Sequence, residues 1–273
     1  ENIYRTVIEA PKIARKRKAG QFVMLRVDEP GERIPLTISD ADPEAGTIAI
    51  VFQTVGYTTK QLGTLEAGDY VLDVAGPLGH PTHIEKFGTV VSIGGGLGIA
   101  LGRSITEAFY KAGNHVIAII SARNKSLLIL EEEMKKICNE LMIATDDGSC
   151  GFHGFPTQVL QQLIDNGRKI DLVVAVGPVP LMAAVSKLTK PYGIKTIVSL
   201  NPIMVDATGM CGACRVTVGG VTRFGCVEGP EFDGHQVDYD ELMKRLKTYA
   251  EQEKEMDARF VAARSREIQE VKR

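Results

Sequence analysis

The sequence predicts a β plus α/β fold: an antiparallel barrel, then a doubly wound domain, a small cysteine-rich module and a helical tail. Three observations predict it. Short β runs without intervening helices come first, strands then alternate with helix-compatible segments, and three cysteines crowd into residues 211–226. Closely spaced short strands are typical of a small barrel, whereas strand and helix in alternation are typical of a parallel sheet covered on both faces.

The predicted elements divide the chain into four regions. The barrel region is residues 1–84, with strands expected at 3–8, 22–27, 36–39, 47–53 and 70–74. The α/β region is residues 85–200, with strands expected at 90–93, 115–120, 142–145, 172–176 and 196–200. Apolar periodicity predicts crossover helices within 127–141 and 158–164.

The cysteine-rich module is residues 201–232, and the helical tail is residues 233–273. The tail carries apolar residues at helix-compatible spacings on an otherwise charged segment. These residues are Leu242, Leu246, Tyr249, Met256 and Phe260. Because an apolar stripe on a charged helix has to be covered, we expect this one to contact a partner subunit.

Composition excludes several classes of partner. With 32 Lys and Arg against 34 Asp and Glu, the formal charge of the 273 residues is −2, which favours neither nucleic acid nor an anionic membrane. The longest apolar runs, such as residues 172–176, are far shorter than the roughly 20 residues of a membrane helix. No secretory signal opens the sequence, so we expect a cytoplasmic protein.

The cysteines give the most specific signal. Five of them, unevenly spread, argue against a disulfide framework and favour metal binding. The four candidate ligands follow the x₄, x₂ spacing of plant-type ferredoxins, with an aspartate in the first position. They are Asp206, Cys211, Cys214 and, after eleven further residues, Cys226. A closed zinc site with three thiolates and one carboxylate is the alternative, but the spacing favours [2Fe–2S] and no His completes the usual zinc pattern.

Two motifs of the barrel region suit a flavin nucleotide. A guanidinium can bind a pyrophosphate through paired hydrogen bonds, and a hydroxyl or N–H on a strand can reach the edge of an isoalloxazine ring. A Gly-x-Thr-Thr turn that opens a helix offers donors to the same phosphates. The two motifs comprise Arg33, Pro35, Leu36, Thr37, Gly56, Thr58 and Thr59. Each is weak alone, because an Arg before a Pro is commonly a surface residue at a strand start.

Glycines and turn residues follow the strands of the α/β region, where ligands of doubly wound sheets bind. Glycines after the first strand let a phosphate approach the backbone, although the register of the dinucleotide fingerprint is absent and a plain tight turn is the alternative. The residues of this edge are Gly94, Gly95, Gly96, Gly98, Arg123, Asp147, Gly177 and Pro178. Arg123 suits either a 2′-phosphate or the adenosine site, so NADH and NADPH both remain open.

The other reactive side chains receive no site role. Cys138 lies in an amphipathic segment, where we expect it to be a buried apolar residue. Cys150 either faces the nicotinamide pocket or packs in a glycine-rich loop, and packing is favoured because cysteine is so often buried. His80, His153 and His235 show no ligand spacing.

Taken in order, these motifs resemble the ferredoxin-NADP reductase superfamily over almost the whole chain, in the branch that carries a C-terminal [2Fe–2S] module. That branch includes the electron-transfer subunit of type B dihydroorotate dehydrogenase, the gamma subunit of sulfhydrogenases and the small subunit of NADH-dependent reduced ferredoxin:NADP oxidoreductase, also known as sulfide dehydrogenase. Gly76 belongs to the turn that leaves the barrel in this family, and Val176 replaces a Cys of many relatives. Dihydroorotate dehydrogenase subunits have Cys at the position of Asp206. A ligand set of one aspartate and three cysteines resembles that of the small subunit of the ferredoxin:NADP oxidoreductase.

The resemblance implies cofactors, partner and activity. FAD is expected in residues 1–84, NAD(H) in 85–200 and the [2Fe–2S] cluster in 201–232. Hydride would pass from NADH to flavin N5 near Thr37, and electrons would continue through the cluster to a larger subunit with its own flavin and [4Fe–4S] clusters. The implied protein is thus a flavin- and iron–sulfur-dependent NAD(P)H oxidoreductase subunit of an electron-bifurcating heterodimer, which reaches ferredoxin through the complex and needs no catalytic side chain.

Two other interpretations remain open from the sequence. One is the electron-transfer subunit of type B dihydroorotate dehydrogenase, for which Asp206 is the discordant residue. The other is a non-enzymatic docking protein, whose cysteine module is stabilised by zinc.

Overall fold

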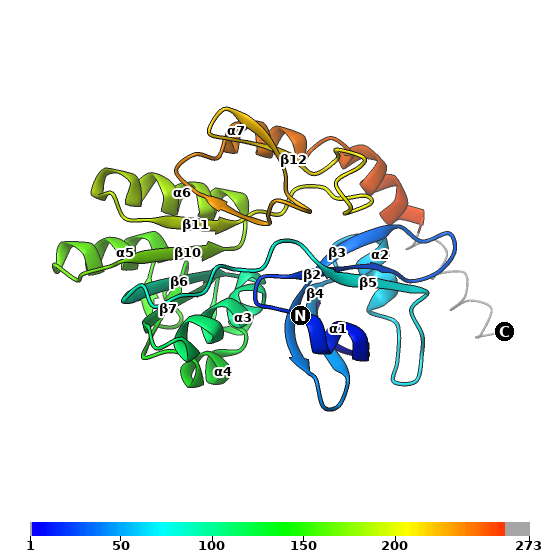
Figure 1. Cartoon of the computed structure of the whole chain (residues 1–273), viewed down its shortest axis with the longest axis horizontal. Coiled ribbons are helices and arrows are strands. Elements are labelled where there is room, and N and C mark those ends of the chain that lie inside the picture. Colours follow the sequence, from blue (N-terminus) through cyan, green and yellow to red (C-terminus); the bar gives the residue numbers. More distant parts are fainter. Residues whose placement is uncertain (1, 260–273) are drawn as a thin grey trace.

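The computed structural model describes residues 2–259 and begins with a curled antiparallel sheet around one apolar core (Figure 1). We call this part the barrel domain. Its strand order is β1-β4-β3-β2-β5. The strands are β1 (Ile3–Glu9), β2 (Phe22–Arg26), β3 (Arg33–Asp42), β4 (Thr47–Gln53) and β5 (Asp73–Leu78), with the short helices α1 (Pro11–Lys16) and α2 (Tyr57–Leu62).

Strand β2 is apolar on both faces. Val23 and Leu25 point into the barrel core, where they meet residues of β3, β4 and α2. Phe22 and Met24 point to the opposite face, as the two-residue period of a strand requires. The barrel domain therefore presents a second apolar surface, which another part of the chain covers.

The second part, the parallel-sheet domain, has seven strands in the order β14-β11-β10-β6-β7-β8-β9. All pair in parallel except β14, which is antiparallel to β11. The strands are β6 (Thr89–Gly95), β7 (His115–Ala122), β8 (Glu140–Thr145), β9 (Phe152–His153), β10 (Leu172–Val176), β11 (Thr196–Ser199) and β14 (Glu231–Asp233). The chain reverses direction across the sheet between β6 and β10, so the switch point lies between these two strands.

Helices cover both faces of this sheet (Figure 1). Successive residues of β6 alternate between two cores: Val91 and Ile93 pack in one, and Val90 packs in the other. The helices are α3 (Gly98–Lys111), η1 (Lys125–Leu127), α4 (Glu131–Lys136), α5 (Pro156–Asp165), α6 (Val179–Thr189) and η2 (Lys190–Tyr192). This arrangement confirms the predicted fold class of an antiparallel sheet followed by a doubly wound domain.

The cysteine-rich segment contains one hairpin, formed by β12 (Arg215–Val218) and β13 (Val221–Phe224), and the chain then returns to the parallel sheet through β14. The tail continues with α7 (Tyr239–Arg245) and a second helical stretch at residues 250–259.

Some predicted boundaries are wrong. The strand expected at 70–74 starts only at Asp73, and Tyr70 is 89% exposed in the preceding loop. The helix expected across 127–141 is confined to α4, because Leu130 adopts a left-handed conformation before it and Glu140 already begins β8. Strand β3 extends from Arg33 to Asp42, well beyond the predicted 36–39, because β2 and β4 pair along its length.

The tail is covered differently from what we expected. Leu242 is 1% exposed and joins the core of the parallel-sheet domain, and Leu246 packs against the same core. The chain's own domain, and not a partner, therefore covers the first part of the stripe. Tyr249 remains 47% exposed, and Phe260 lies outside the described residues.

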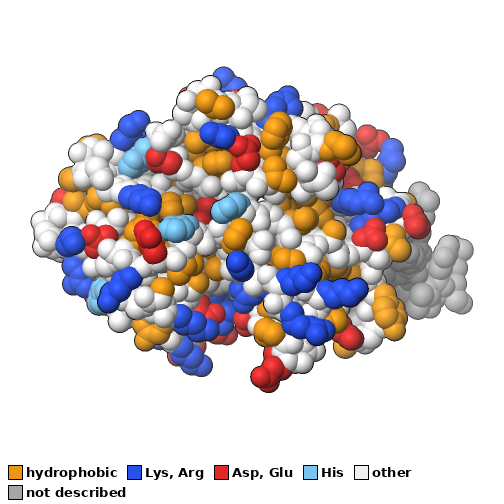
Figure 2. All heavy atoms as spheres, viewed as in Figure 1, with side chains coloured by type: hydrophobic (Ala, Val, Ile, Leu, Met, Phe, Trp, Pro, Cys, Tyr) orange, Lys and Arg blue, Asp and Glu red, His pale blue; other side chains and the backbone are white. Residues whose placement is uncertain are grey.

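The surface carries acidic and basic side chains interspersed over the face shown in Figure 2, in keeping with the nearly balanced charge. Among residues 2–259 no helix has both the length and the apolar character needed to cross a membrane.

Glu231 lies where β14 meets the linker between the two domains. Its Oε1 accepts a hydrogen bond from the Thr82 hydroxyl, and burial raises its pKa to about 7. The neighbouring cavity of about 280 Å³ is also lined by the titratable side chains of His80, His83, Lys195 and Asp233. The neutral acid is therefore the form that the fold favours at this junction.

We predict a pH-dependent effect of Glu231→Gln. A raised carboxyl pKa contributes stability that is fully present below about pH 4.5 and is lost as the pH rises through about 7. The variant should match the wild type near pH 4.5 and unfold at higher urea concentration at pH 8, by a free energy on the order of 3 kcal/mol. The control is Glu44→Gln at an exposed turn; an equal stability difference at both pH values would contradict the prediction.

Candidate functional site

The four predicted ligands lie together in the loops around the hairpin, as two pairs. The sulfurs of Cys214 and Cys226 are 3.1 Å apart, and both residues are buried. Asp206 Oδ2 accepts a hydrogen bond of 2.9 Å from the backbone N–H of Cys211, which is exposed. Within residues 2–259 no group of three His, Cys, Asp or Glu side chains is arranged to hold a single metal ion.

The charge state of these groups follows from their surroundings. Burial raises the pKa of Cys226 to about 12, and the adjacent Cys214 thiol adds to the effect. Hydrogen bonds from Thr208 and Cys211 hold the pKa of Asp206 below its ordinary value. The buried Cys226 thiol is therefore neutral, and the Asp206 carboxyl group is ionised. Since thiolates are the form that binds metal, binding here has to release protons.

The loop that carries the ligands is shaped by small residues. Ala207, Gly209 and Gly212 all have positive φ angles, of 59°, 83° and 68°. Two arginines bind its carbonyl groups: Arg215 donates to Gly212 at 3.0 Å, and Arg245 of α7 donates to Ala213 at 3.1 Å. The tail helix thus helps to fix the ligand loop, a role that no local sequence pattern indicates.

The buried ligand pair packs directly on the barrel domain. Cys214 and Cys226 share one apolar cluster with Phe22 and Met24 of strand β2, and with Met204. Backbone pairing then joins Phe22 to Thr37 of β3 on one side and to Leu78 of β5 on the other. Strand β2 therefore connects the two: it packs against the cysteines and pairs with β3, which carries residues predicted to bind a flavin.

Arg33 begins strand β3, and its guanidinium is half exposed, with Asp73 Oδ2 at 3.9 Å. Its cross-strand neighbour is Arg26, whose guanidinium contacts Glu29 and lies 3.8 Å from the same Asp73. The Arg26 side chain is mostly covered, so it fixes the loop before Arg33. Arg33 thus keeps donors that can reach an anionic ligand. Pro35, Leu36 and Thr37 follow along β3, half buried.

The hydroxyls predicted beside the flavin phosphates make bonds within the chain. Thr58 donates to Glu32 Oε2 at 3.1 Å and is 3% exposed. The Thr59 hydroxyl accepts from the N–H groups of Val55 and Gly56, both at 3.1 Å. Thr58 thus connects α2 to the loop that precedes Arg33, and Thr59 fixes the turn at the start of α2. A methyl group placed on Gly56 would meet no atom within 4 Å, so the space in front of this turn is open.

The glycines at the end of β6 and in the loop after it allow close packing on one side and leave room on the other. A Cβ on Gly98 would lie 2.2 Å from the carbonyl oxygen of Val176, so only glycine lets α3 start this close to β10. Gly94 and Gly95 are similarly restricted by Ile99 and Leu181. Gly96, with φ of 54°, has no atom within 4 Å of such a Cβ, so the tip of the loop is open to a ligand.

The remaining predicted residues lie at the same edge of the sheet, except Gly76. Arg123 follows β7 and is exposed, and its carbonyl oxygen accepts from the Asp147 N–H at 3.2 Å. Hydrogen bonds from Ser149 hold the pKa of Asp147 below its ordinary value. Gly177 and Pro178 follow β10 and precede α6. Gly76 lies within β5, packed against Val23.

The other reactive side chains lie outside this arrangement. Cys138 is buried in a core of the parallel-sheet domain, as expected. The backbone N–H and carbonyl groups of Cys150 both bond to the Thr145 hydroxyl, which supports packing in its loop.

Comparison with known proteins supports these features. A family model described as the iron–sulfur cluster binding domain of dihydroorotate dehydrogenase B matches residues 201–238. A Thermotoga maritima protein named "dihydroorotate dehydrogenase B (NAD(+)), electron transfer subunit homolog" is 46% identical over 96% of this chain and 92% of its own length. The chain belongs to the dihydroorotate dehydrogenase B electron-transfer subunit family. A family member from Fusobacterium nucleatum is 30% identical over 88% of this chain and 94% of its own.

A solved structure is similar to this chain over nearly its full length. It comes from work titled "Insights into flavin-based electron bifurcation via the NADH-dependent reduced ferredoxin-NADP oxidoreductase structure". The match has a TM-score of 0.91 and 46% identity, and covers 96% of this chain and 94% of the other. These findings confirm the predicted resemblance and its ferredoxin reductase-like fold. The family match also establishes an iron–sulfur-binding domain on a flavin- and NAD-binding type of fold.

Sequence reasoning missed several residues that position the site. Phe22 and Met24 were predicted only as part of an apolar strand. The signal that could have found their role is the apolar run itself, because a strand that is apolar on both faces is buried on both sides. Arg245 acts on the ligand loop from 32 positions away, so only the fold brings it there.

We predict that Arg33→Ala weakens flavin retention. The substitution removes a charge-assisted hydrogen bond to phosphate, worth about 1.5–3 kcal/mol. Flavin content after extensive dilution and gel filtration measures the effect. Arg5→Ala, at an exposed arginine on β1 of the same sheet, is the matched control; full flavin occupancy in both variants would show that Arg33 does not bind the cofactor.

Proposed function

We propose that this chain is the nicotinamide-side electron-transfer subunit of an electron-bifurcating ferredoxin:NADP oxidoreductase. It exchanges electrons between NAD(H) and FAD, and passes them through a [2Fe–2S] cluster to a larger subunit. The observation that carries the proposal is the apolar cluster that Cys214 and Cys226 share with Phe22, whose backbone pairs with Thr37. This packing brings the metal ligands and the flavin strand into one continuous structure.

The chain's own residues bind and orient the cofactors. Arg33 binds the FAD pyrophosphate, and Thr37 offers a polar group to the edge of the flavin ring. The open loop at Gly96, together with Gly177 and Pro178, receives the nicotinamide nucleotide, while Arg123 lines the adenosine side. When bound, the flavin supplies the conversion of a hydride carrying two electrons into single-electron steps. No side chain of this scheme acts as an acid, base or nucleophile.

The ligand arrangement favours a [2Fe–2S] cluster over a single zinc ion. Four ligands in two pairs suit two metal atoms that each take two protein donors. For metal–sulfur bonds of about 2.3 Å, a tetrahedral metal separates two sulfurs by about 3.8 Å. The 3.1 Å between Cys214 and Cys226 needs only a small outward shift to reach this value. Asp206 and Cys211 would bind the second iron.

The family name and the solved relative support a partner. The Thermotoga relative is named an electron transfer subunit homolog, and the solved relative belongs to a ferredoxin-NADP oxidoreductase. We infer a heterodimer with a larger subunit that carries a second flavin and [4Fe–4S] clusters and reaches ferredoxin. Exposed Cys211 and its neighbour Met210, which is 86% exposed, form the accessible side of the ligand loop.

Dihydroorotate dehydrogenase B is the second candidate, favoured by the names of several relatives and by the family model. The two functions differ in the oxidisable substrate of the partner subunit. Purification of the chain with its native partner, followed by assays with dihydroorotate and with reduced ferredoxin plus NADP⁺, separates them.

Cofactor analysis tests the proposal directly. The anaerobically purified complex should contain FAD, and this chain should account for two iron and two sulfide per copy. A colourless protein that contains zinc and lacks flavin would overturn the proposal and support the docking protein.

Substitutions at Asp206 distinguish a metal ligand from a residue that only shapes the loop. Its carboxylate accepts hydrogen bonds from Thr208 and Cys211, which an Asn could partly retain and a Cys could not. If Asp206 is a ligand, Asp206→Cys should keep a cluster with an altered EPR spectrum and reduction potential, because thiolate is a softer donor. Asp206→Asn should then lose most of its iron. Retention of an unchanged cluster in Asp206→Asn, with loss in Asp206→Cys, would assign the residue to loop structure alone.

A further inference from the structure

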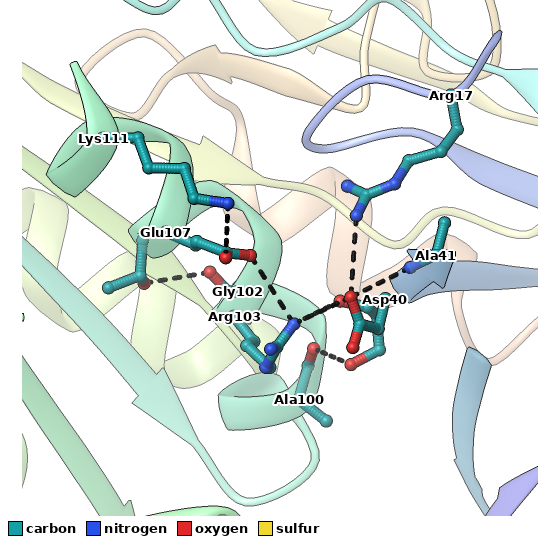
Figure 3. A network of polar contacts seen from close by, with 10 residues as sticks. Arg17, Asp40, Ala41, Ala100, Gly102, Arg103, Glu107 and Lys111 are labelled. Carbon is teal, nitrogen blue, oxygen red and sulfur yellow. Dashed lines mark hydrogen bonds and ion pairs between the residues drawn. The ribbon is translucent and has the colours of Figure 1, made fainter. Parts of the chain in front are cut away.

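Strand β3 and helix α3 form a polar joint between the two domains (Figure 3). The Ser39 hydroxyl is buried and donates to the carbonyl oxygen of Ala100 at 2.8 Å. Arg103 Nη1 lies 3.2 Å from Asp40 Oδ1 and 3.4 Å from the Ser39 carbonyl oxygen. Two neighbouring residues of the barrel domain therefore bind one turn of α3.

A β-bulge explains why neighbours in a strand contact the same helix. The pairing of β3 with β4 shifts between Ile38 and Asp40, so Ser39 has no regular partner in the ladder. Adjacent side chains of a regular strand point to opposite faces, but a bulge changes their direction. Ile38 remains in the barrel core, while Ser39 and Asp40 both turn to α3.

The joint contains alternating charges. Asp40 Oδ1 also lies 3.8 Å from Arg17 Nη2. Arg103 Nη1 also lies 3.7 Å from Glu107 Oε2, and the other oxygen of Glu107 lies 2.7 Å from Lys111 Nζ. The side chains of Arg17 and Arg103 are each only 16% exposed. Burial lowers the pKa of Arg17. Since unpaired buried guanidinium groups are costly, loss of the Asp40 charge leaves two of them with weaker partners.

Each side of the joint lies close in sequence to one half of the proposed cofactor site. On β3, Thr37 is two residues before Ser39. On α3, Gly98 is two residues before Ala100, and its Cα lies so near Val176 that any side chain would clash. Displacement of α3 relative to β3 therefore moves the glycine loop relative to the flavin strand.

We propose that Asp40 and Arg103 are positioning residues, which set the separation and angle between the nicotinamide-binding loop and the flavin-binding strand. Neither belongs to the residues that we assign to a cofactor, and both act through the elements that carry those residues. This inference rests on the proposed function, because the separation matters for a hydride that leaves the nicotinamide with two electrons and is accepted by the flavin. A misplacement on the order of 1 Å costs such a reaction about 100-fold in rate.

The test compares Asp40→Asn with Asp42→Asn in the complete complex. Asp42 lies on the same strand, and its carboxylate accepts hydrogen bonds from the backbone N–H groups of Glu44 and Ala45 in the following turn. Anaerobic stopped-flow mixing with NADH, and separately with NADPH, measures the rate of flavin reduction and the long-wavelength flavin–nicotinamide charge-transfer band. Asp40→Asn should slow reduction at least ten-fold and weaken the band, while flavin content, flavin potential and nucleotide affinity stay unchanged. Asp42→Asn should match the wild type.

A second measurement reports on the joint without any reaction. Spin labels introduced through unnatural amino acids at exposed Glu9 of the barrel domain and Asp165 of the parallel-sheet domain give the interdomain distance distribution. Asp40→Asn should broaden this distribution and Asp42→Asn should not.

Equal rates and equal distributions in both variants would overturn the inference. A broadened distribution with an unchanged reduction rate would also overturn it, because the joint would then be structural only. If neither nucleotide reduces the wild-type flavin, the proposed function fails and the inference that rests on it is overturned too, even if Asp40→Asn alone broadens the distribution.

Discussion

Pairing of β2 with β3 is the constraint on which the proposed site depends. The start of β3 carries the residues proposed to bind the flavin, its bulged end binds α3, and β2 packs the cysteine module on its outer face. Hydrogen-bonded strands have a fixed register, so Phe22 lies opposite Thr37 and any slip by one residue would reverse both faces. The three proposed cofactor sites thus take their relative positions from two adjacent strands.

The residues around the ligands serve two physical requirements at once. The buried Cys226 thiol resists ionisation, so metal binding is tied to the release of protons and to a formed module. Exposed Cys211 leaves one side of the loop accessible. A cluster held in this way would be shielded on the flavin side by Phe22 and Met24, and open on the side where electrons leave.

Local patterns predicted the features that depend on nearby residues. The fold class, the ligand spacing and the glycine turns all follow from periodicity or from positions a few residues apart. Ser39 and Asp40 could not be predicted, because the bulge that aims them exists only when β3 pairs with β4. The covered face of α7 was misassigned for a similar reason: Leu242 meets a core assembled from distant strands, and a helical stripe does not reveal what lies against it.

The order of electron transfer within the complex tests the central claim most directly. After anaerobic mixing of the complete complex with NADH, stopped-flow absorption and rapid-freeze EPR report the flavin and the cluster separately. We expect the flavin to be reduced first and the EPR signal of a reduced [2Fe–2S] cluster to follow. A flavin that is fully reduced and reoxidised by the partner, while the cluster stays oxidised throughout, would show that electrons leave this chain by another route.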